Sequence, residues 1–377
     1  MRKALIALLA AGLLSSVTLT ACDDGADSDD TSVSGTSGNS SGTSSGAGKN
    51  GVGVILPDTT SSTRWKNDDP KYLAAAFKAA NIPYEIQNAE GDPEAFKAIG
   101  NALLASGVKV LVIANFDSTS AKVVIDAAKA RKIPVIDYDR LTLNGGADYY
   151  VSFDNEEVGR LQGEGLVSCL TKKDVEDPVI AELNGSPTDN NATQFKTGYD
   201  GVLQAKYDAA TYMKGPDQWV QDWDADEGKE IFAQMLKQWP NIDGVLSAND
   251  GLGNAAIEVL KSKGLNGKVP VTGQDATVQG LQNILAGDQC MTVYKATKKE
   301  ADAAAELAIA LVKGSKKTVD DKIKDPESGA YVPFVKLSPV SITFKTVKTL
   351  VTEGYVTYKD LCTSKYAAKC AAAGIDS

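Results

Sequence analysis

Short apolar runs alternate with stretches of helical period along most of the chain after residue 50. The runs are rich in Val and Ile: GVGVIL, VKVLVIAN, IPVIDY, YYVSF, PVIAELN, DGVLSAN, KVPVTG and CMTVY. Apolar residues at helical spacing follow them, as in 70–80, 119–131 and 156–170. Continuous apolar strands alternating with helices are typical of parallel sheets covered on both faces. Together with the length of 377 residues, the pattern predicts an α/β fold with two doubly wound parallel-sheet lobes.

The first fifty residues have a different pattern. Residues 1–22 combine Arg2 and Lys3 with an apolar run and small residues, which predicts a secretory signal peptide. The segment 19–22, Leu-Thr-Ala-Cys, resembles the lipobox of bacterial lipoproteins, which implies a lipid on Cys22. Residues 23–50 are rich in Ser, Gly and Asp, which predicts a disordered linker. We therefore expect an exported protein, held at the cell membrane only through its lipid anchor.

Composition removes several kinds of chemistry. The chain has no histidine, which excludes Ser-His-Asp and Cys-His mechanisms and histidine-bearing zinc sites. The net charge of −10 argues against a nucleic-acid partner. No C-x-x-C spacing is present, so neither a metal nor a cofactor is expected.

Polar side chains follow most of the predicted strands. Ligands of open α/β sheets lie beyond the carboxyl ends of the strands, so these side chains predict a binding site. Carboxylate, amide and guanidinium groups can each engage adjacent hydroxyls, and indole rings can cover the C–H face of a sugar. For Asp189 and Asp250 the alternative of a simple helix N-cap stays open, as does an ordinary packing role for the tryptophans.

The ordered motifs resemble one known family. They are TRWKND (63–68), YDR (138–140), YVSFDNEEVGRLQ (150–162), NGSPTDNNA (184–192), DQWVQDW (217–223), SAND (247–250), TGQDA (272–276) and MTVYK (291–295). Over residues 51 to about 350 the chain resembles the D-xylose-binding and multiple-sugar-binding proteins of ABC importers, within the ribose-type (type I) periplasmic binding proteins. The resemblance implies two lobes joined by a three-strand hinge, which close on one monosaccharide.

Carried over motif by motif, the resemblance implies ten ligand-binding residues: Arg64, Trp65, Asp139, Arg140, Asp189, Asn191, Trp223, Asn249, Asp275 and Lys295. It also implies lobe one at 51–153 plus 296–337 and lobe two at 154–295 plus 338–377. The expected ligand is an aldose, D-xylose first, with glucose, galactose or arabinose as alternatives. The expected partner is a membrane permease, and the protein is expected to act as a monomer.

Four cysteines remain after Cys22. An even number in an exported chain suggests disulfide bonds with three possible connectivities. We favour Cys362 with Cys370, and Cys169 with Cys290, because the alternating topology puts Cys169 at a helix end and Cys290 at a strand start on the same side of lobe two.

Four other functions are weighed against sugar binding for transport. Residues 251–256 match a dinucleotide fingerprint, but Asp250 before them would repel a pyrophosphate. A glycosidase would need one carboxylate pair at catalytic spacing, and a repressor of the same fold would need an N-terminal helix-turn-helix. We therefore expect no enzyme. A sensory role, in which the loaded protein docks on a membrane receptor, stays open.

Overall fold

The computed structural model describes residues 43–45 and 50–376. The signal peptide, Cys22 and most of the predicted linker lie outside these residues. Within them, one sheet has eight strands, in the order β1 (Thr43–Ser45), β3 (Tyr84–Asn88), β2 (Val52–Leu56), β4 (Val110–Ile113), β5 (Val135–Tyr138), β6 (Tyr149–Phe153), β12 (Tyr331–Leu337) and β11 (Lys322–Lys324). The six central strands are parallel, and the edge strands β1 and β11 are antiparallel.

Strand β1 lies inside the stretch for which composition predicts a linker. It pairs with β3 through its backbone, which requires no apolar side chains. Strand β3 was not predicted from the sequence, because polar Glu85 and Gln87 alternate with Tyr84 and Ile86 and no continuous apolar run results.

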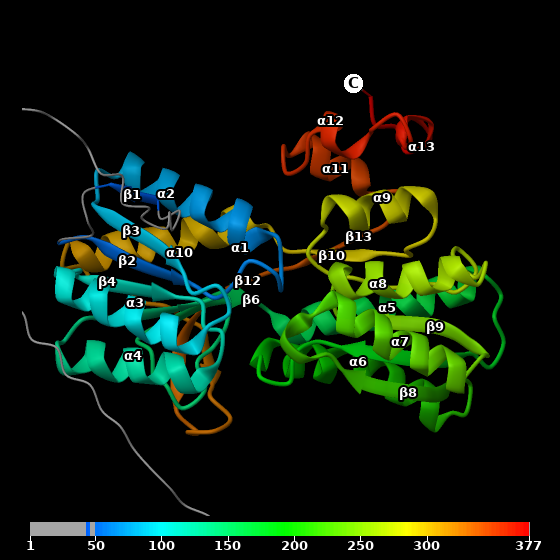
Figure 1. Cartoon of the computed structure of the whole chain (residues 1–377), viewed down its shortest axis with the longest axis horizontal. Coiled ribbons are helices and arrows are strands. Elements are labelled where there is room, and N and C mark those ends of the chain that lie inside the picture. Colours follow the sequence, from blue (N-terminus) through cyan, green and yellow to red (C-terminus); the bar gives the residue numbers. More distant parts are fainter. Residues whose placement is uncertain (1–42, 46–49, 377) are drawn as a thin grey trace, which may run out of the picture. The chain divides into compact units, whose positions relative to one another are not determined.

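Helices cover both faces of this sheet (Figure 1). Helices α2 (Asp69–Ala79) and α10 (Thr297–Val312) pack on the face that carries Val52 and Val54. Helices α3 (Pro93–Ser106) and α4 (Ser118–Ala130) pack on the opposite face with Ile55. Because successive strand side chains point to opposite faces, one apolar run supplies both cores. We call this part of the fold lobe one.

Lobe two contains the second set of strands. Parallel strands β8 (Met213–Trp219), β7 (Val179–Asn184) and β9 (Ile242–Ser247) form a sheet, and β10 (Thr292–Tyr294) pairs antiparallel with β13 (Val340–Ile342). Single parallel bridges, Val245 to Val271 and Gln274 to Val293, link the two sets. The prediction of a full strand in KVPVTG was therefore wrong. Pro270, directly before Val271, has no backbone N–H to donate to a neighbouring strand.

Helices surround the strands of lobe two as well. Beside them lie α5 (Asn155–Lys172), α6 (Asn190–Asp208), α7 (Ala225–Gln238), α8 (Asp250–Ser262), α9 (Val278–Ala286) and the short 3₁₀ turn η1 (Gln221–Trp223). Helices α5, α6, α7 and α8 share one continuous apolar core with the strands. Residues that follow the strands of lobe two start several of these helices, which places their side chains at one edge of the sheet.

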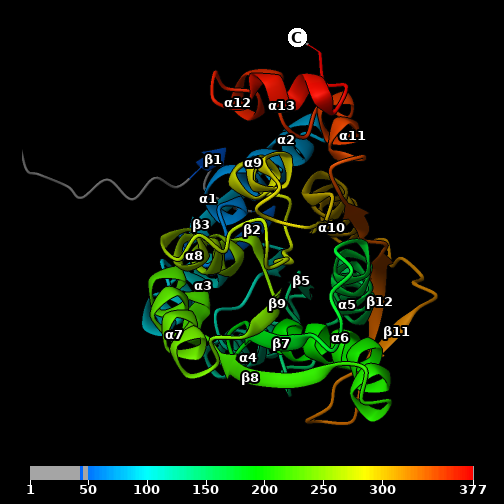
Figure 2. The ribbon, with the colours of Figure 1, turned by 90° about the vertical axis from the view of Figure 1, so that its right-hand side faces the viewer.

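Within residues 50–376 the chain passes between the two lobes three times. It does so between β6 and α5, between β10 and α10, and between β12 and β13. After β13 it ends in three short helices, α11 (Val347–Thr352), α12 (Tyr358–Leu361) and α13 (Ala367–Ala372), which lie beside α9 (Figures 1 and 2). Disulfide bonds join Cys169 to Cys290 and Cys362 to Cys370, the two pairings that the sequence favours.

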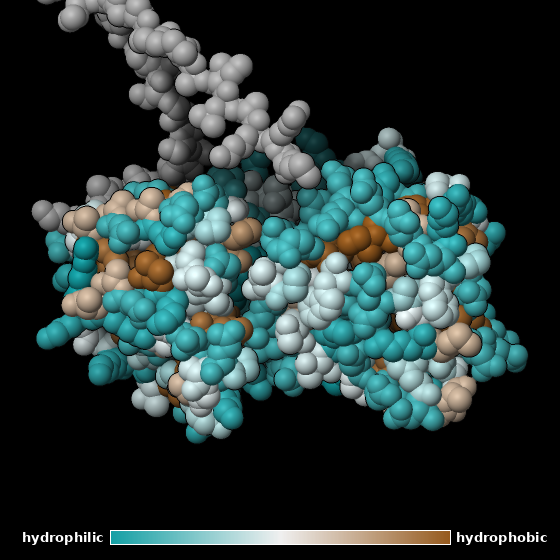
Figure 3. Space-filling view, turned by 60° about the horizontal axis from the view of Figure 1, so that its bottom comes forward, coloured by the Kyte–Doolittle hydropathy of each residue, from teal (hydrophilic) through white to brown (hydrophobic). Residues whose placement is uncertain are grey.

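The surface is mostly polar where it is visible. The face in Figure 3 is largely hydrophilic, with hydrophobic residues scattered singly or in small groups. None of the helices described is both long enough and apolar enough to span a membrane.

Candidate functional site

All ten residues singled out from the sequence line one cavity between the lobes. The cavity is small, with a volume of about 30 Å³. Nine of the ten are buried, and the Asp275 side chain is 14% exposed. Four further residues line the same cavity: Ser61, Ser62, Phe195 and Gln274.

Asp139 stands at the end of β5 and faces three cations. Its backbone has φ 63°, a left-handed conformation that costs a non-glycine residue about 1–2 kcal/mol. Burial alone would raise the pKa of Asp139, but Lys295, Arg64 and Arg140 outweigh it and lower this pKa to about 2. The carboxylate is therefore held ionised at neutral pH, as a permanent hydrogen-bond acceptor.

Arg64 belongs to the one-turn helix α1 (Arg64–Asn67) that follows the first loop. Its Nη1 lies 2.9 Å from Asp139, while Nε and Nη2 bond both carboxylate oxygens of Asp69. Nη2 also lies 2.5 Å from Glu300 of α10, whose pKa burial raises to about 8 against the opposing effect of Arg64. Most of the donors of Arg64 are thus used within lobe one. The resemblance implies that Arg64 donates to the ligand, and one Nη1 proton is left for that role.

Trp65 is covered by cations. The Arg64 guanidinium lies 4.4 Å from the centroid of the Trp65 ring, and that of Arg140 lies 5.5 Å away. Cations at these distances are attracted to the indole face. They compete with a ligand for that face.

Arg140 and Asp189 form an ion pair between the lobes. Arg140 Nε lies 3.2 Å from Asp189 Oδ2, and the Arg140 head group also donates to Asn115 O and Ser61 Oγ. Asp189 caps α6 by accepting from Asn191 N, and it accepts a bond from Trp223 Nε1 at 3.1 Å. Asp189 therefore both caps α6 and lines the cavity.

Two asparagines complete the cavity from lobe two. Asn191 Nδ2 donates to Asp139 O at 2.9 Å, a second contact between the lobes. Asn249 caps α8 by accepting from Leu252 N, which leaves its Nδ2 donor on the cavity side. Asp250, the other residue considered as a cap, is the first residue of α8. Its buried carboxylate accepts from Thr277, Gln289 and Thr292.

Asp275 and Lys295 close the remaining side. Lys295 Nζ lies 3.4 Å from Asp139 and 3.6 Å from Asp275. Ser62 Oγ of lobe one donates to Asp275 Oδ2 at 3.4 Å, a third contact between the lobes. Asp275 has φ 87° and Trp223 has φ 60°, so three of the ten residues have left-handed backbone. Such strain concentrates where proteins bind ligands.

Two polar atoms of the cavity wall lack a partner. Trp65 Nε1 and Gln274 Oε1 are buried and have no hydrogen-bond partner within the described residues. A buried polar atom without a partner costs about 1–3 kcal/mol, and a hydrogen bond to a ligand would recover this cost.

The four additional lining residues differ in how far the sequence could reveal them. Gln274 lies in TGQDA directly beside Asp275, and the two serines lie in the polar loop before Arg64. Their closeness in the sequence to predicted site residues could therefore have marked them as lining residues. Phe195 lies inside α6 at apolar spacing and has the pattern of a core residue. Its ring contacts Trp223 edge to face and lies 5.8 Å from Lys295 Nζ.

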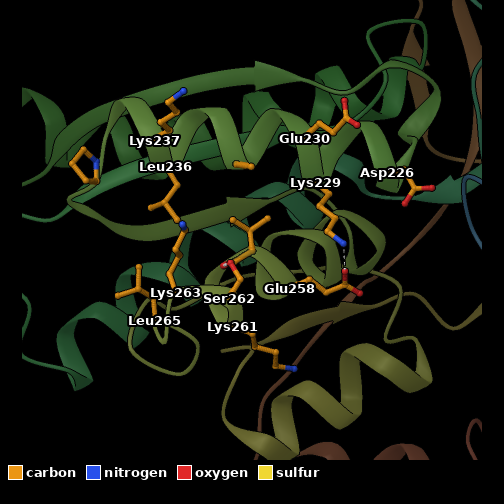
Figure 4. A pocket seen from close by; sticks show the side chains of 13 residues that line it. Asp226, Lys229, Glu230, Leu236, Lys237, Glu258, Lys261, Ser262, Lys263 and Leu265 are labelled. Atoms are coloured by element: carbon orange, nitrogen blue, oxygen red, sulfur yellow. Dashed lines mark hydrogen bonds and ion pairs between the residues drawn. The ribbon is translucent and has the colours of Figure 1, made fainter.

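A larger hollow lies on the surface of lobe two, between α7 and α8 (Figure 4). It encloses about 1290 Å³ and is lined by residues such as Leu236, Lys237 and Leu265, with an exposed ion pair between Lys229 and Glu258. Its charged groups come from helix surfaces, and none of the ten strand-end residues lines it. The polar groups that can orient a ligand converge in the smaller cavity between the lobes.

Comparison with known proteins identifies the family. Residues 52–316 match the family described as periplasmic binding protein domain. The chain belongs to the periplasmic binding protein family. It has the type I periplasmic binding protein fold, with mostly parallel sheets in two lobes.

Relatives are similar over most of their length. The chain is 33% identical to the D-xylose-binding periplasmic protein of Escherichia coli (strain K12), covering 81% of this chain and 90% of the relative. It is 37% identical to the multiple sugar-binding periplasmic protein SbpA of Azospirillum brasilense, covering 81% and 89%. An ABC transporter solute binding protein from Clostridium phytofermentans with bound β-D-glucose superposes with a TM-score of 0.76 at 28% identity, covering 82% and 99%.

These relatives are binding proteins and not enzymes. The geometry also disfavours both enzyme alternatives. The glycines of the dinucleotide-like segment lie within α8, directly behind the buried Asp250 carboxylate. Asp139, which three cations keep ionised, is poorly suited to act as the general acid of a glycosidase.

Proposed function

We propose that this periplasmic binding protein is the extracytoplasmic receptor of an ABC sugar importer and binds an aldopyranose, D-xylose first, between its lobes. The observation that carries the proposal is the convergence of ten polar and aromatic side chains from both lobes on one cavity. The relatives named for D-xylose and several sugars support the same class of ligand.

The charge balance of the cavity favours a neutral ligand. Three cationic side chains, Arg64, Arg140 and Lys295, face three carboxylates, Asp139, Asp189 and Asp275. A sugar phosphate would bring its charge close to all three carboxylates, which is unfavourable in a buried site. A neutral sugar can accept from the cations and donate to the carboxylates at the same time.

The pattern of relatives favours a sugar with equatorial hydroxyls. D-xylose and D-glucose present the same hydroxyls at ring carbons 2, 3 and 4 and differ by one hydroxymethyl group. Close packing around the cavity favours the smaller of the two, so we place D-xylose first and D-glucose second. Phe195 and Trp223 supply aromatic surface for the C–H face of the ring.

Binding requires the lobes to move apart and close again. The cavity leaves little free space, about 30 Å³, and side chains from both lobes bond one another across it. We propose that residues 51–153 plus 296–337 rotate against residues 154–295 plus 338–377 about the three crossing segments. Hydroxyls of the sugar then replace part of the contacts between the lobes.

The cellular setting is part of the proposal. The signal peptide and Cys22 lie outside the described residues, and we propose that lipid on Cys22 anchors the protein outside the cytoplasm. From there the loaded, closed form would deliver its sugar to a membrane permease.

Calorimetric titration of the purified protein tests the ligand. We expect one D-xylose per chain, weaker binding of D-glucose, and much weaker binding of galactose, arabinose and ribose. A folded, sugar-free protein that binds none of the five would contradict the proposal.

A further inference from the structure

The last segment of the chain forms a small unit that packs against the hinge side of lobe two. This C-terminal module comprises residues 343–376, with α11, α12, α13 and the Cys362–Cys370 bond. It lies on α9 in both ribbon views (Figures 1 and 2). Its apolar residues share one buried cluster with Phe153, Tyr294 and Ala296, which lie at two of the three passages between the lobes.

Tyr355 links this module to the ligand cavity. It lies between α11 and α12, and its hydroxyl donates to the main-chain oxygen of Asp275 at 2.8 Å. Its ring centroid lies 4.6 Å from that of Tyr294, directly before Lys295 in the chain. Tyr355 does not line the cavity, so it contacts Asp275 from behind.

The backbone that Tyr355 holds is strained. Asp275 has φ 87° and the following Ala276 has φ 49°, so two successive residues with side chains are left-handed. Asp275 N donates to Val293 O, and Ala276 N donates to Thr292 Oγ1. Both acceptors of these two bonds belong to β10. The hydrogen bond from the Tyr355 hydroxyl fixes the carbonyl group of Asp275. Without it, this turn would be free to relax toward a more common conformation.

We propose that Tyr355 is a positioning residue for sugar binding, which holds Asp275 so that its carboxylate faces Lys295 and the cavity. The C-terminal module thereby completes the site without contacting the ligand. This inference rests on the proposed function, since the affinity that it changes is that for sugar.

Tyr355→Phe removes only the hydroxyl and is the direct test. We expect it to weaken D-xylose binding roughly three- to tenfold, the usual effect of one hydrogen bond. Hydrogen exchange at the amides of residues 275–277 should also become faster in the sugar-free protein. Tyr358→Phe is the matched control, because Tyr358 belongs to the same module and its hydroxyl makes no hydrogen bond within the described residues. It should change neither measurement.

A double-mutant cycle separates positioning from a general loss of structure. Asp275→Gly removes the carboxylate, and glycine tolerates the left-handed backbone. In that background Tyr355→Phe should change affinity by less than about twofold, since nothing is left to position. The same loss in both backgrounds, or wild-type affinity and exchange in Tyr355→Phe, would overturn the inference and leave the sugar receptor standing. A wild-type protein that binds no sugar would instead overturn the proposed function, and unchanged exchange would then reject the role of Tyr355 as well.

Discussion

Replacing Arg140 by alanine should weaken sugar binding more than most single changes in the cavity. Arg140 makes an ion pair with Asp189 of the other lobe and two hydrogen bonds within lobe one, to Asn115 O and Ser61 Oγ. When the lobes open, water can solvate Asp189. When they close on a sugar without Arg140, this carboxylate is buried with one partner fewer.

The magnitude follows from the partner that is lost. A hydrogen bond to a charged group is worth about 1.5–3 kcal/mol, and a buried group left unpaired costs about as much. We therefore expect Arg140→Ala to destabilise the closed, loaded form by at least about 2 kcal/mol, or about 30-fold in affinity. Arg140→Lys keeps the charge but not the planar fork, so its loss should be smaller.

Calorimetry with D-xylose measures both variants. Arg131→Ala is a suitable control, because Arg131 is an exposed arginine at the end of α4, outside the cavity. Thermal unfolding of each variant shows whether the fold survives. Wild-type affinity in Arg140→Ala would refute the reasoning, because it would show that the contact between Arg140 and Asp189 contributes nothing to sugar binding.

Three further results are expected. Lys295→Gln removes the cation that lowers the pKa of Asp139 most, so this pKa should rise. The pH below which sugar binding is lost, measured by titration from pH 3 to 7, should therefore move to a higher value. An unchanged value would exclude the interaction of Lys295 with Asp139 as its cause. Burial raises the pKa of Asp137 to about 7, so wild-type stability in urea should fall as pH rises from about 4 through 7, and Asp137→Asn should flatten this slope. The Cys169–Cys290 bond closes 121 residues and the Cys362–Cys370 bond closes 8, so replacing each pair by serine should cost about 5 and about 2.5 kcal/mol of unfolding free energy. Equal losses would count against the loop-length argument.

The strand ends were predictable because apolar residues fill the buried strands of this chain and polar residues follow directly after them. Parallel strands buried on both faces read as apolar runs, so a polar residue such as Asp139 or Asn249 at the end of a run stands out. Strands that break this rule were missed: β3 alternates polar and apolar residues, and β8 contains Gly215 and Pro216.

The supporting contacts could not be predicted in the same way. Glu300 lies within α10 and Phe195 within α6, and only the packing of helices against the sheets brings them to Arg64 and Trp223. Nothing local in the sequence marks Asp275 as left-handed, because the turn depends on partners such as Val293 and Tyr355. The strand-end pattern and the family resemblance together therefore pointed to the groups that face the cavity, but not to the groups that hold them.

A crystal structure of the protein with D-xylose would test the central claim most directly. We predict one pyranose ring between the lobes, with its hydroxyls bonded to Asp139, Arg140, Asp189 and Asp275. Arg140 and Asp189 should each bond the sugar in addition to, or in place of, each other. A sugar bound elsewhere, for example in the hollow between α7 and α8, or lobes that stay paired with no sugar between them, would contradict the account.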